Sequence, residues 1–192
     1  MAADRTMIAD ILRVDHAGEY GAIRIYEAQR WAARRRTPDL MDFLTHTLGD
    51  ERRHLEVFAR LMRERGVTPC GALPLWGLGG GLLGLMTGLL GRTAILICTE
   101  AVERTVHRHL TDQIAWLQGR DTEVSDAIAA IGIEELEHLQ TATGGAGSRR
   151  SQPWARALDG VVAAATETLI WLSTYGASRR LARAIRAGRG QG

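Results

Sequence analysis

The sequence predicts one all-α domain, a four-helix bundle with an additional C-terminal helix. Apolar residues recur at spacings of three and four, no segment alternates as strands do, and aromatic residues are only 5% of the chain. A length of 192 residues suits one domain and leaves no room for two large ones. We therefore interpret residues 1–192 as a single domain.

Composition excludes several classes of protein. The formal net charge is +2, which argues against a strongly basic nucleic-acid-binding protein. Cys70 and Cys98 form no CxxC motif, so neither a disulfide framework nor a zinc ribbon is expected. The N-terminus has no apolar targeting segment, which favours a bacterial cytoplasmic protein or a processed organellar one.

Charge is distributed unevenly along the chain. Residues 1–137 carry a net charge of −4, whereas residues 138–192 carry +6. The basic tail, about residues 178–192, contains Arg179, Arg180, Arg183, Arg186 and Arg189 and no acid. It is either a solvated helix end or a contact with anionic lipid headgroups.

The first two helices have recognisable boundaries. The first is expected at about 6–35. Thr37, Pro38 and Asp39 then suit an N-cap, a proline at the first helical position and an acid in the first turn. A second helix should therefore begin here and reach about Arg65, with Gly66 ending it.

An apolar insertion, residues 67–91, contains no charge. Its 25 residues match a membrane span in length, but eight glycines and two prolines weaken a helix. We expect a loop and a short apolar helix that faces the membrane interface or caps a lipid pocket. A buried segment and a true span are the alternatives. Trp76, Leu82, Leu85 and Leu89 are expected to face substrate or membrane.

Three more helices should follow. One is expected at about 92–118 before Gly119, and the next begins at 121–123. Residues 144–148 are rich in glycine and are predicted to form a loop. Pro153 and Trp154 then open the additional C-terminal helix, which continues into the basic tail.

Acids and histidines interrupt the apolar stripes of two helices. Glu51 and His54 continue the stripe of the second helix, and Glu135 and His138 continue that of the helix after 121–123. A Glu and a His three residues apart lie on one helix face, so both can reach the same metal ion.

The other two helices each carry one carboxylate on a comparable stripe, Glu19 and Glu103. Each precedes the next Glu-x-x-His glutamate by 32 residues, so the chain repeats one arrangement twice. This is the ligand pattern of ferritin-like di-iron carboxylate bundles. We predict a metal site formed by Glu19, Glu51, His54, Glu103, Glu135 and His138, for which iron or manganese suits better than zinc. The alternative is that these are surface residues of amphipathic helices.

Two further acids adjoin the predicted ligands. Asp50 and Glu134 could each accept a hydrogen bond from a ligand histidine on the facing helix, although exposed helix acids are equally compatible with the sequence. His107 and His109 lack the ligand spacing, so we expect them to be solvated or to lie outside the metal ligands.

The segment RVDHAGEYGA, residues 13–22, resembles the signature of the demethoxyubiquinone hydroxylases, the di-iron enzymes of ubiquinone biosynthesis. The resemblance runs from about Ile8 to Leu172. Further matches are PLW at 74–76, CT at 98–99, AVE at 101–103, His109, QI at 113–114 and EELEH at 134–138.

The resemblance implies a specific reaction. It implies the same six metal ligands, with Glu51 and Glu135 bridging two iron ions, and O2-dependent hydroxylation of a polyprenylated 6-methoxy-3-methyl-benzoquinol late in ubiquinone biosynthesis. Electrons would come from an external reductant, NAD(P)H or a partner reductase, because no GxGxxG motif follows a strand.

The resemblance also implies a location. The enzyme would be a peripheral membrane protein on the cytoplasmic face of a bacterial inner membrane. It would contact lipid and other ubiquinone-biosynthesis proteins, with no nucleic acid.

Two other functions remain open. A ferritin- or rubrerythrin-like iron oxidase or peroxidase uses the same ligand set, but it needs no lipid access and a rubrerythrin needs a CxxC iron site. A metal-free helical membrane adaptor explains the apolar insertion and basic tail, but it leaves six ionisable residues on core stripes unexplained. The sequence leaves open the prenyl tail length, the number of ring positions hydroxylated, the oligomeric state, and whether 76–90 contacts lipid or a protein.

Overall fold

The computed structural model describes residues 2–147 and 151–174, and all the regular elements within these ranges are helices. The predicted all-α class is therefore confirmed. The elements are α1 (Ala2–Arg36), the 3-10 helix η1 (Pro38–Leu40), α2 (Met41–Glu64), α3 (Leu73–Leu90), α4 (Arg92–Leu117), α5 (Thr122–Ala146) and α6 (Pro153–Thr174). The basic tail 178–192 lies outside the described residues.

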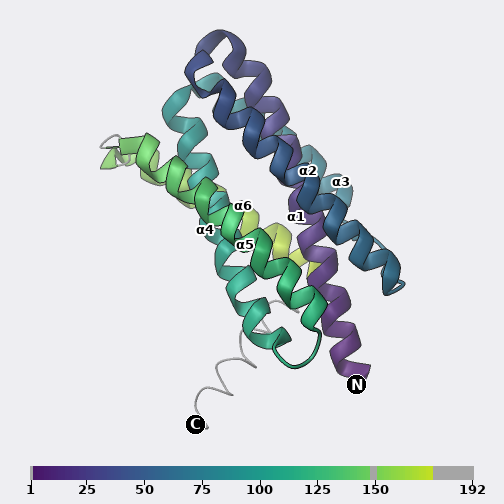
Figure 1. Ribbon diagram of the computed structural model, residues 1–192. Helices are drawn as coiled ribbons and strands as arrows, with labels where there is room; N and C mark the ends of the chain where they lie inside the picture. Colours follow the sequence, from purple (N-terminus) through teal and green to yellow (C-terminus); the bar gives the residue numbers. More distant parts are fainter. Residues whose placement is uncertain (1, 148–150, 175–192) are drawn as a thin grey trace.

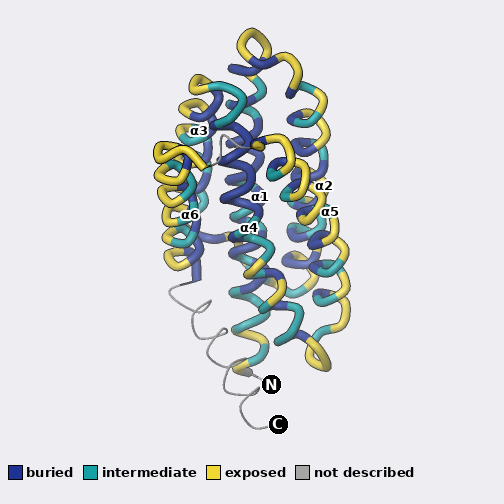
Figure 2. The backbone as a smooth tube through the Cα atoms, turned by 90° about the vertical axis from the view of Figure 1, so that its left-hand side faces the viewer, coloured by how far each residue is buried: buried dark blue, intermediate teal, exposed yellow. Residues whose placement is uncertain are grey.

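The helices form three layers, each of two helices (Figures 1 and 2). α1 and α4 form the central layer, α2 and α5 pack on one side of it, and α3 and α6 pack on the other. The series α1–α2–α3 and α4–α5–α6 thus adopt the same arrangement. The predicted four-helix bundle consists of α1, α2, α4 and α5, and α6 is the predicted additional helix.

Apolar side chains close both ends of the bundle. One cluster includes the buried Leu12, Phe58 and Ile128, and a second includes Leu44 and Leu96. Each such side chain contributes about 1.5–3 kcal/mol when it is fully buried. Between the two clusters the buried residues are carboxylates and histidines, so the apolar ends enclose a polar centre.

The connection between α1 and α2 differs from the prediction. Thr37 was expected to cap a helix that runs to Arg65, but a 3-10 turn intervenes and α2 begins at Met41. The side chain of Thr37 makes no capping hydrogen bond. Its backbone N–H instead donates to Ala33 O at 2.9 Å, so Thr37 closes the last turn of α1.

The predicted loop at 144–148 is wrong for its first three residues. α5 continues through Gly144 and Gly145 and ends at Ala146. A Cβ atom added at Gly145 would lie 3.0 Å from Leu96 Cδ1, which is tighter than ordinary packing. The glycine therefore permits close approach of α5 to α4, and this packing offsets its low helix propensity.

The apolar insertion forms a loop followed by a helix, as expected, although α3 is 18 residues long rather than short. Cβ atoms added at Gly80 and Gly84 would overlap the carbonyl oxygens of Gly21 and Ile25 on α1. Glycine is therefore required where the two backbones meet, which explains how a glycine-rich segment becomes a stable helix. By length and composition, Leu73–Leu90 is also apolar enough to cross a membrane.

Candidate metal centre and apolar cavity

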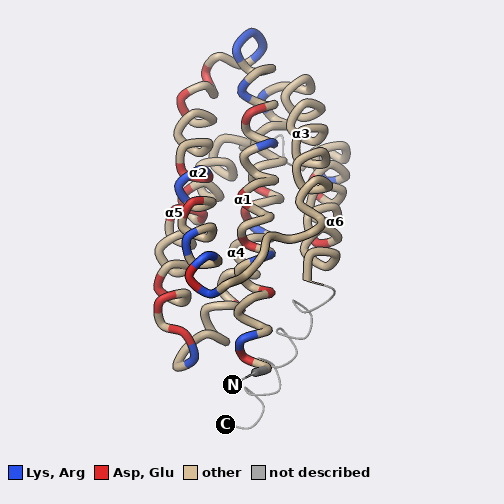
Figure 3. The backbone as a smooth tube through the Cα atoms, turned by 90° about the vertical axis from the view of Figure 1, so that its right-hand side faces the viewer, with Lys and Arg blue, Asp and Glu red and all other residues tan. Residues whose placement is uncertain are grey.

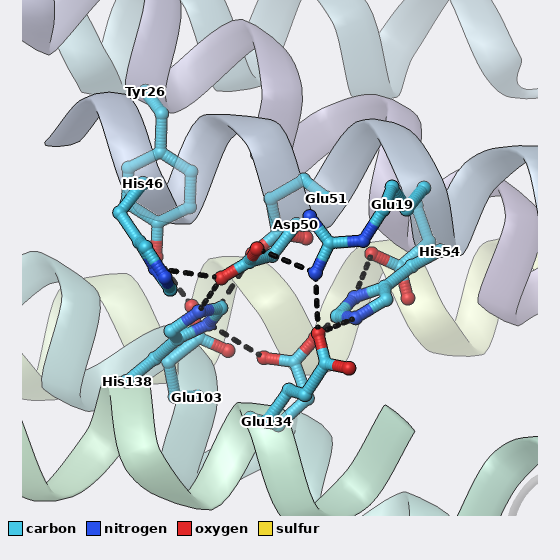
Figure 4. Close-up of polar contacts among 11 residues, drawn as sticks. Glu19, Tyr26, His46, Asp50, Glu51, His54, Glu103, Glu134 and His138 are labelled. Carbon is cyan, nitrogen blue, oxygen red and sulfur yellow. Dashed lines mark hydrogen bonds and ion pairs between the residues drawn. The ribbon is translucent and has the colours of Figure 1, made fainter. Parts of the chain in front are cut away.

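The six predicted ligands meet at the polar centre of the bundle. Each of the four bundle helices contributes: Glu19 from α1, Glu51 and His54 from α2, Glu103 from α4, and Glu135 and His138 from α5 (Figure 4). All six are buried. The 3.6-residue helical period places each Glu-x-x-His pair on one inward face.

The ligand atoms form two groups that share two residues. One group is Glu19, Glu51, His54 and Glu135, and the other is Glu51, Glu103, Glu135 and His138. Within each group, one donor atom per residue lies within 4.8 Å of the others. Glu51 and Glu135 belong to both groups, which is the geometry that bridging carboxylates between two ions require.

Several donor atoms in these groups have no hydrogen-bond partner among the residues that the structure describes. They are Glu51 Oε1, Glu135 Oε2 and the Nδ1 atoms of His54 and His138. Such buried polar atoms are costly unless something binds them. A donor set of four carboxylates and two imidazoles fits a pair of iron or manganese ions.

The electrostatics of the site also favour cations. Burial, and then the neighbouring carboxylates, raise the pKa of Glu51 and Glu103 well above the ordinary range. Burial disfavours the charged form of His54, but the nearby carboxylates of Glu135 and Glu19 raise its pKa to about 11. The metal-free site therefore balances its carboxylates with bound protons, which a metal ion would displace.

Each ligand histidine is also held by a carboxylate on the facing helix. His54 Nε2 lies 3.1 Å from Glu134 Oε2, and His138 Nε2 lies 2.9 Å from Asp50 Oδ2. Arg53 joins both carboxylates, at 2.7 Å from Asp50 Oδ1 and 2.9 Å from Glu134 Oε2 (Figure 4). A proton on Nε2 that is donated outward leaves the Nδ1 lone pair directed at the centre.

The sequence alone did not identify Tyr26, whose hydroxyl donates a hydrogen bond to Glu103 Oε1. Tyr26 is buried, and burial together with Glu103 raises its pKa well above the ordinary value, so it remains a donor. It follows Glu19 by seven residues on the same face of α1. That spacing is the sequence feature that could have indicated a role for Tyr26 near Glu19.

An apolar cavity of about 150 Å³ leads away from the candidate metal centre. It lies between α1, α3, α4 and α6, reaches Glu19 and Glu103 at its inner end, and is lined by apolar residues such as Leu83, Val106 and Leu169. α6 is a wall of this cavity, a role that the sequence did not reveal.

Trp76 lies inside the molecule. It is 6% exposed, lines the cavity, and donates from Nε1 to Ser173 Oγ at 2.6 Å. It therefore lies beside the cavity and is not exposed on the outer side of α3. His109 also lines the cavity, with Nε2 at 3.2 Å from Glu167 Oε1, whereas neither His109 nor His107 belongs to the two ligand groups.

The outer sides of α3 and α6 lie on the same side of the molecule and carry exposed residues, and we call this surface the α3–α6 face (Figure 2). α3 carries no charged residue (Figure 3). Leu82, Leu85 and Leu89 are exposed on it, as are other large apolar residues. The others are Leu75, Leu78, Met86 and Leu90 from α3, and Trp154, Val161, Trp171 and Leu172 from α6.

Comparison with known proteins identifies the family. The family model described as "Ubiquinone biosynthesis protein COQ7" matches residues 6–173. A Rhodospirillum rubrum protein named 3-demethoxyubiquinol 3-hydroxylase is 36% identical over 167 residues, which cover 87% of this chain and 77% of that protein.

Two eukaryotic relatives carry the name NADPH-dependent 3-demethoxyubiquinone 3-hydroxylase, mitochondrial. The Dictyostelium discoideum protein is 34% identical, covering 88% of this chain and 78% of that one. The Homo sapiens protein is 38% identical, covering 70% and 63%. The candidate metal centre lies within the matched residues, and the chain belongs to the COQ7 family of ubiquinone-biosynthesis hydroxylases.

Proposed function

We propose that this chain hydroxylates a polyprenylated 6-methoxy-3-methyl-benzoquinol with O2, at a pair of iron ions held by Glu19, Glu51, His54, Glu103, Glu135 and His138. The observation that carries the proposal is the position of two ligand groups, sharing Glu51 and Glu135, at the inner end of an apolar cavity. In the reaction a ring C–H bond is replaced by C–OH. The second oxygen atom leaves as water, with two electrons and two protons from an external reductant.

Bound iron would supply O2 reduction, and the chain supplies the surroundings. Asp50 and Glu134 hold the protons on His138 Nε2 and His54 Nε2, which keeps both imidazoles oriented. The Tyr26 hydroxyl keeps its proton and donates it in a hydrogen bond to Glu103. Apolar walls exclude bulk water, which strengthens every charge interaction inside the site.

The cavity has the volume of one aromatic ring. A cavity of about 150 Å³ in another protein binds benzene, so the quinol ring fits beside the carboxylates. The prenyl tail then leaves between Leu83 on α3 and Leu169 on α6, toward the α3–α6 face. The apolar lining of this path suits a polyprenyl chain and gives a small hydrophilic substrate no advantage.

The α3–α6 face supports peripheral binding to a membrane, for which we propose the cytoplasmic face of a bacterial inner membrane. α3 packs along α1 with direct backbone contact at Gly80 and Gly84. It cannot cross a bilayer without bringing the charged residues of α1, such as Arg24 and Glu27, with it. It therefore lies in the interface, where the quinol is reached from the lipid.

We further propose NAD(P)H, directly or through a partner reductase, as the external reductant. Its support is the name of the Dictyostelium discoideum relative, NADPH-dependent 3-demethoxyubiquinone 3-hydroxylase. Other ubiquinone-biosynthesis proteins are the expected protein partners.

The test measures iron and product together. Protein loaded with ferrous iron without oxygen should bind about two irons per chain. After addition of O2 it should convert the quinol to its hydroxylated product in a single turnover. Glu135→Ala should retain its helical circular dichroism while losing iron and product. The matched control is Glu137→Ala, two residues away and in neither ligand group.

The outcomes separate the three functions considered. Iron without hydroxylated quinol, together with rapid Fe2+ oxidation, would favour an iron oxidase or peroxidase. A folded protein that binds no iron would favour a membrane adaptor.

A further inference from the structure

One polar pair interrupts the apolar lining of the cavity. Gln113 Nε2 on α4 donates to Asp15 Oδ1 on α1 at 2.7 Å, and both residues line the cavity. Asp15 is 9% exposed and Gln113 is 3% exposed. Both residues lie outside the two ligand groups, so metal binding does not account for them.

The pair is only half satisfied. Asp15 Oδ2 and Gln113 Oε1 are buried without a hydrogen-bond partner among the residues that the structure describes. Both free atoms are oxygens. Unpaired oxygens in an apolar cavity are costly, and a ligand that donates hydrogen bonds would remove that cost.

The pair lies next to the candidate metal centre. Asp15 precedes Glu19 by one helical turn, which is about 6 Å along α1. Both residues line the same cavity, so a bound ring can contact the pair with one edge and face the carboxylates with another. The pair can therefore fix which ring carbon is presented to the metals.

We propose that Gln113 binds the substrate ring through Oε1, which accepts a hydrogen bond from a ring hydroxyl, and that Asp15 is a positioning residue that orients the Gln113 amide. The proposal rests on the proposed function. This hydrogen bond makes the site selective for the redox state of the ring, because a quinol can donate to Gln113 whereas a quinone can only accept.

The protonation of Asp15 changes the strength of this selectivity but not its direction. Burial raises the pKa of Asp15 well above its ordinary range, although Gln113 opposes that shift. As an acid, Asp15 still accepts from Gln113 at Oδ1 and can donate from Oδ2 to a ring oxygen. As a carboxylate it offers a second acceptor. In both states Gln113 Oε1 is satisfied only by a donor.

The experiment compares two redox forms of one ligand. Iron-loaded protein, kept without oxygen, is titrated in detergent micelles with the methoxy-methyl-benzoquinol bearing a decyl tail, and separately with the corresponding quinone. Wild-type protein should bind the quinol about tenfold more tightly. Gln113→Met should remove this preference by weakening quinol binding about tenfold, and should change quinone binding less than about twofold. Asp15→Leu should also weaken quinol binding about tenfold, because the Gln113 amide loses its orienting partner.

Asp15→Asn is the matched control. Asparagine keeps an oxygen that accepts from Gln113 Nε2, so the amide stays oriented and the quinol preference should stay within about threefold of wild type. If a single variant does not fold, the double variant Asp15→Leu, Gln113→Met replaces both partners and leaves no unpaired buried group. Iron per chain and helical content should match wild type in every variant.

Each contrary outcome has a distinct meaning. Equal weakening of both redox forms, or an undiminished quinol preference in Gln113→Met, would overturn the ring-binding role. Equal binding of both forms by wild-type protein would overturn it as well. Wild-type protein that binds iron but neither binds nor hydroxylates the quinol would instead overturn the proposed function.

Discussion

The two outer layers of the molecule enclose the same central helices but have opposite chemistry. α2 and α5 provide four of the six candidate ligands, and their outer sides carry charges (Figure 3). α3 and α6 provide no candidate ligand and expose leucine and tryptophan. Metal ions require charged ligands whose protons are held in place, whereas an apolar ring requires an access path that excludes water. The molecule has the ligand-bearing helices on one side of α1 and α4 and the apolar helices on the other, so both requirements are met.

Ion pairs join the end of α2 and its exposed side to α5. We call these two helices the charged layer, and α3 with α6 the apolar layer. Arg65 binds Asp121 at 3.0 Å, Arg60 binds Glu123 at 3.0 Å, and Arg53 joins Asp50 to Glu134. A solvent-exposed pair such as Arg60 with Glu123 contributes about 0–1 kcal/mol. The value of these ion pairs here lies in orienting helices whose inner faces are carboxylates that repel one another.

The largest expected effect is the pH dependence of metal binding in the charged layer. In the metal-free protein the carboxylate partners raise the pKa of His54 to about 11 and also raise that of His138, although burial acts in the opposite direction. The imidazole of His54 is thus protonated near neutrality and must lose a proton to bind metal, and the raised pKa of His138 acts in the same direction. Affinity for Fe2+ should rise with pH, by up to about tenfold per pH unit for each proton that the metal displaces.

Chelator competition at pH values between about 6 and 8 measures this slope. Proton release in weak buffer provides an independent count. A flat profile would show that the histidines are already neutral.

The second effect compares Asp50 with Glu134, which hold the two ligand histidines. Asp50→Asn and Glu134→Gln should each lower metal affinity about 10- to 100-fold. Asp50→Asn should be the more damaging, because the side chain of Asp50 is 3% exposed and that of Glu134 is 42% exposed, so water can replace the latter. Metal titration of both variants checks the order, and equal losses would contradict it.

A third effect concerns the packing of α3, in the apolar layer, on α1. Gly84→Ala should lower the free energy of unfolding by about 1–3 kcal/mol, because the added methyl group overlaps Ile25 O. Gly81 on the same helix has open space around its Cβ position. Gly81→Ala should therefore stabilise the protein, by up to about 1 kcal/mol. Urea denaturation distinguishes the two, and destabilisation by both would indicate a general intolerance of α3.

The smallest effect on folding is expected on the α3–α6 face. The double variant Leu78→Ser, Leu82→Ser should change the unfolding free energy by less than about 1 kcal/mol, since both side chains are exposed. Its binding to liposomes should fall about tenfold. Ile133→Ser makes the same kind of change on α5, where Ile133 is 64% exposed, and should leave liposome binding unchanged. Liposome flotation compares the variants, and equal loss in both would remove the distinction between the layers.

Periodicity predicted much of the fold. The spacing of three and four placed Glu51 with His54, and Glu135 with His138, on inward faces, because helical geometry alone determines which residues share a face. It also indicated the helix order and the loop before α3. Glycine content, in contrast, gave the wrong answer where two helices approach closely. Gly145 was predicted to lie in a loop, yet its lack of a side chain is what lets α5 pack on α4.

Contacts between distant helices were beyond the reach of the sequence. Nothing in the local pattern of α1 or α4 indicated that Asp15 and Gln113 would meet, because that contact depends on helix rotation and register. The sequence did not predict that α6 forms a wall of the cavity, for the same reason. Tyr26 was visible as a member of the Glu19 stripe, but its partner Glu103 lies on another helix.

The hydrogen bond from Tyr26 to Glu103 has a consequence for the two proposed metal positions. Corresponding residues of the two halves lie 84 positions apart, as Glu19 and Glu103 do. By that relation Tyr26 corresponds to Leu110, which cannot donate to Glu19. The twofold pattern of ligands is therefore chemically asymmetric. An ion beside Glu103 would have a carboxylate restrained by a phenol, and an ion beside Glu19 would have one without that restraint. Two irons bound here should be spectroscopically inequivalent, and exchange of ligands should begin at the Glu19 side.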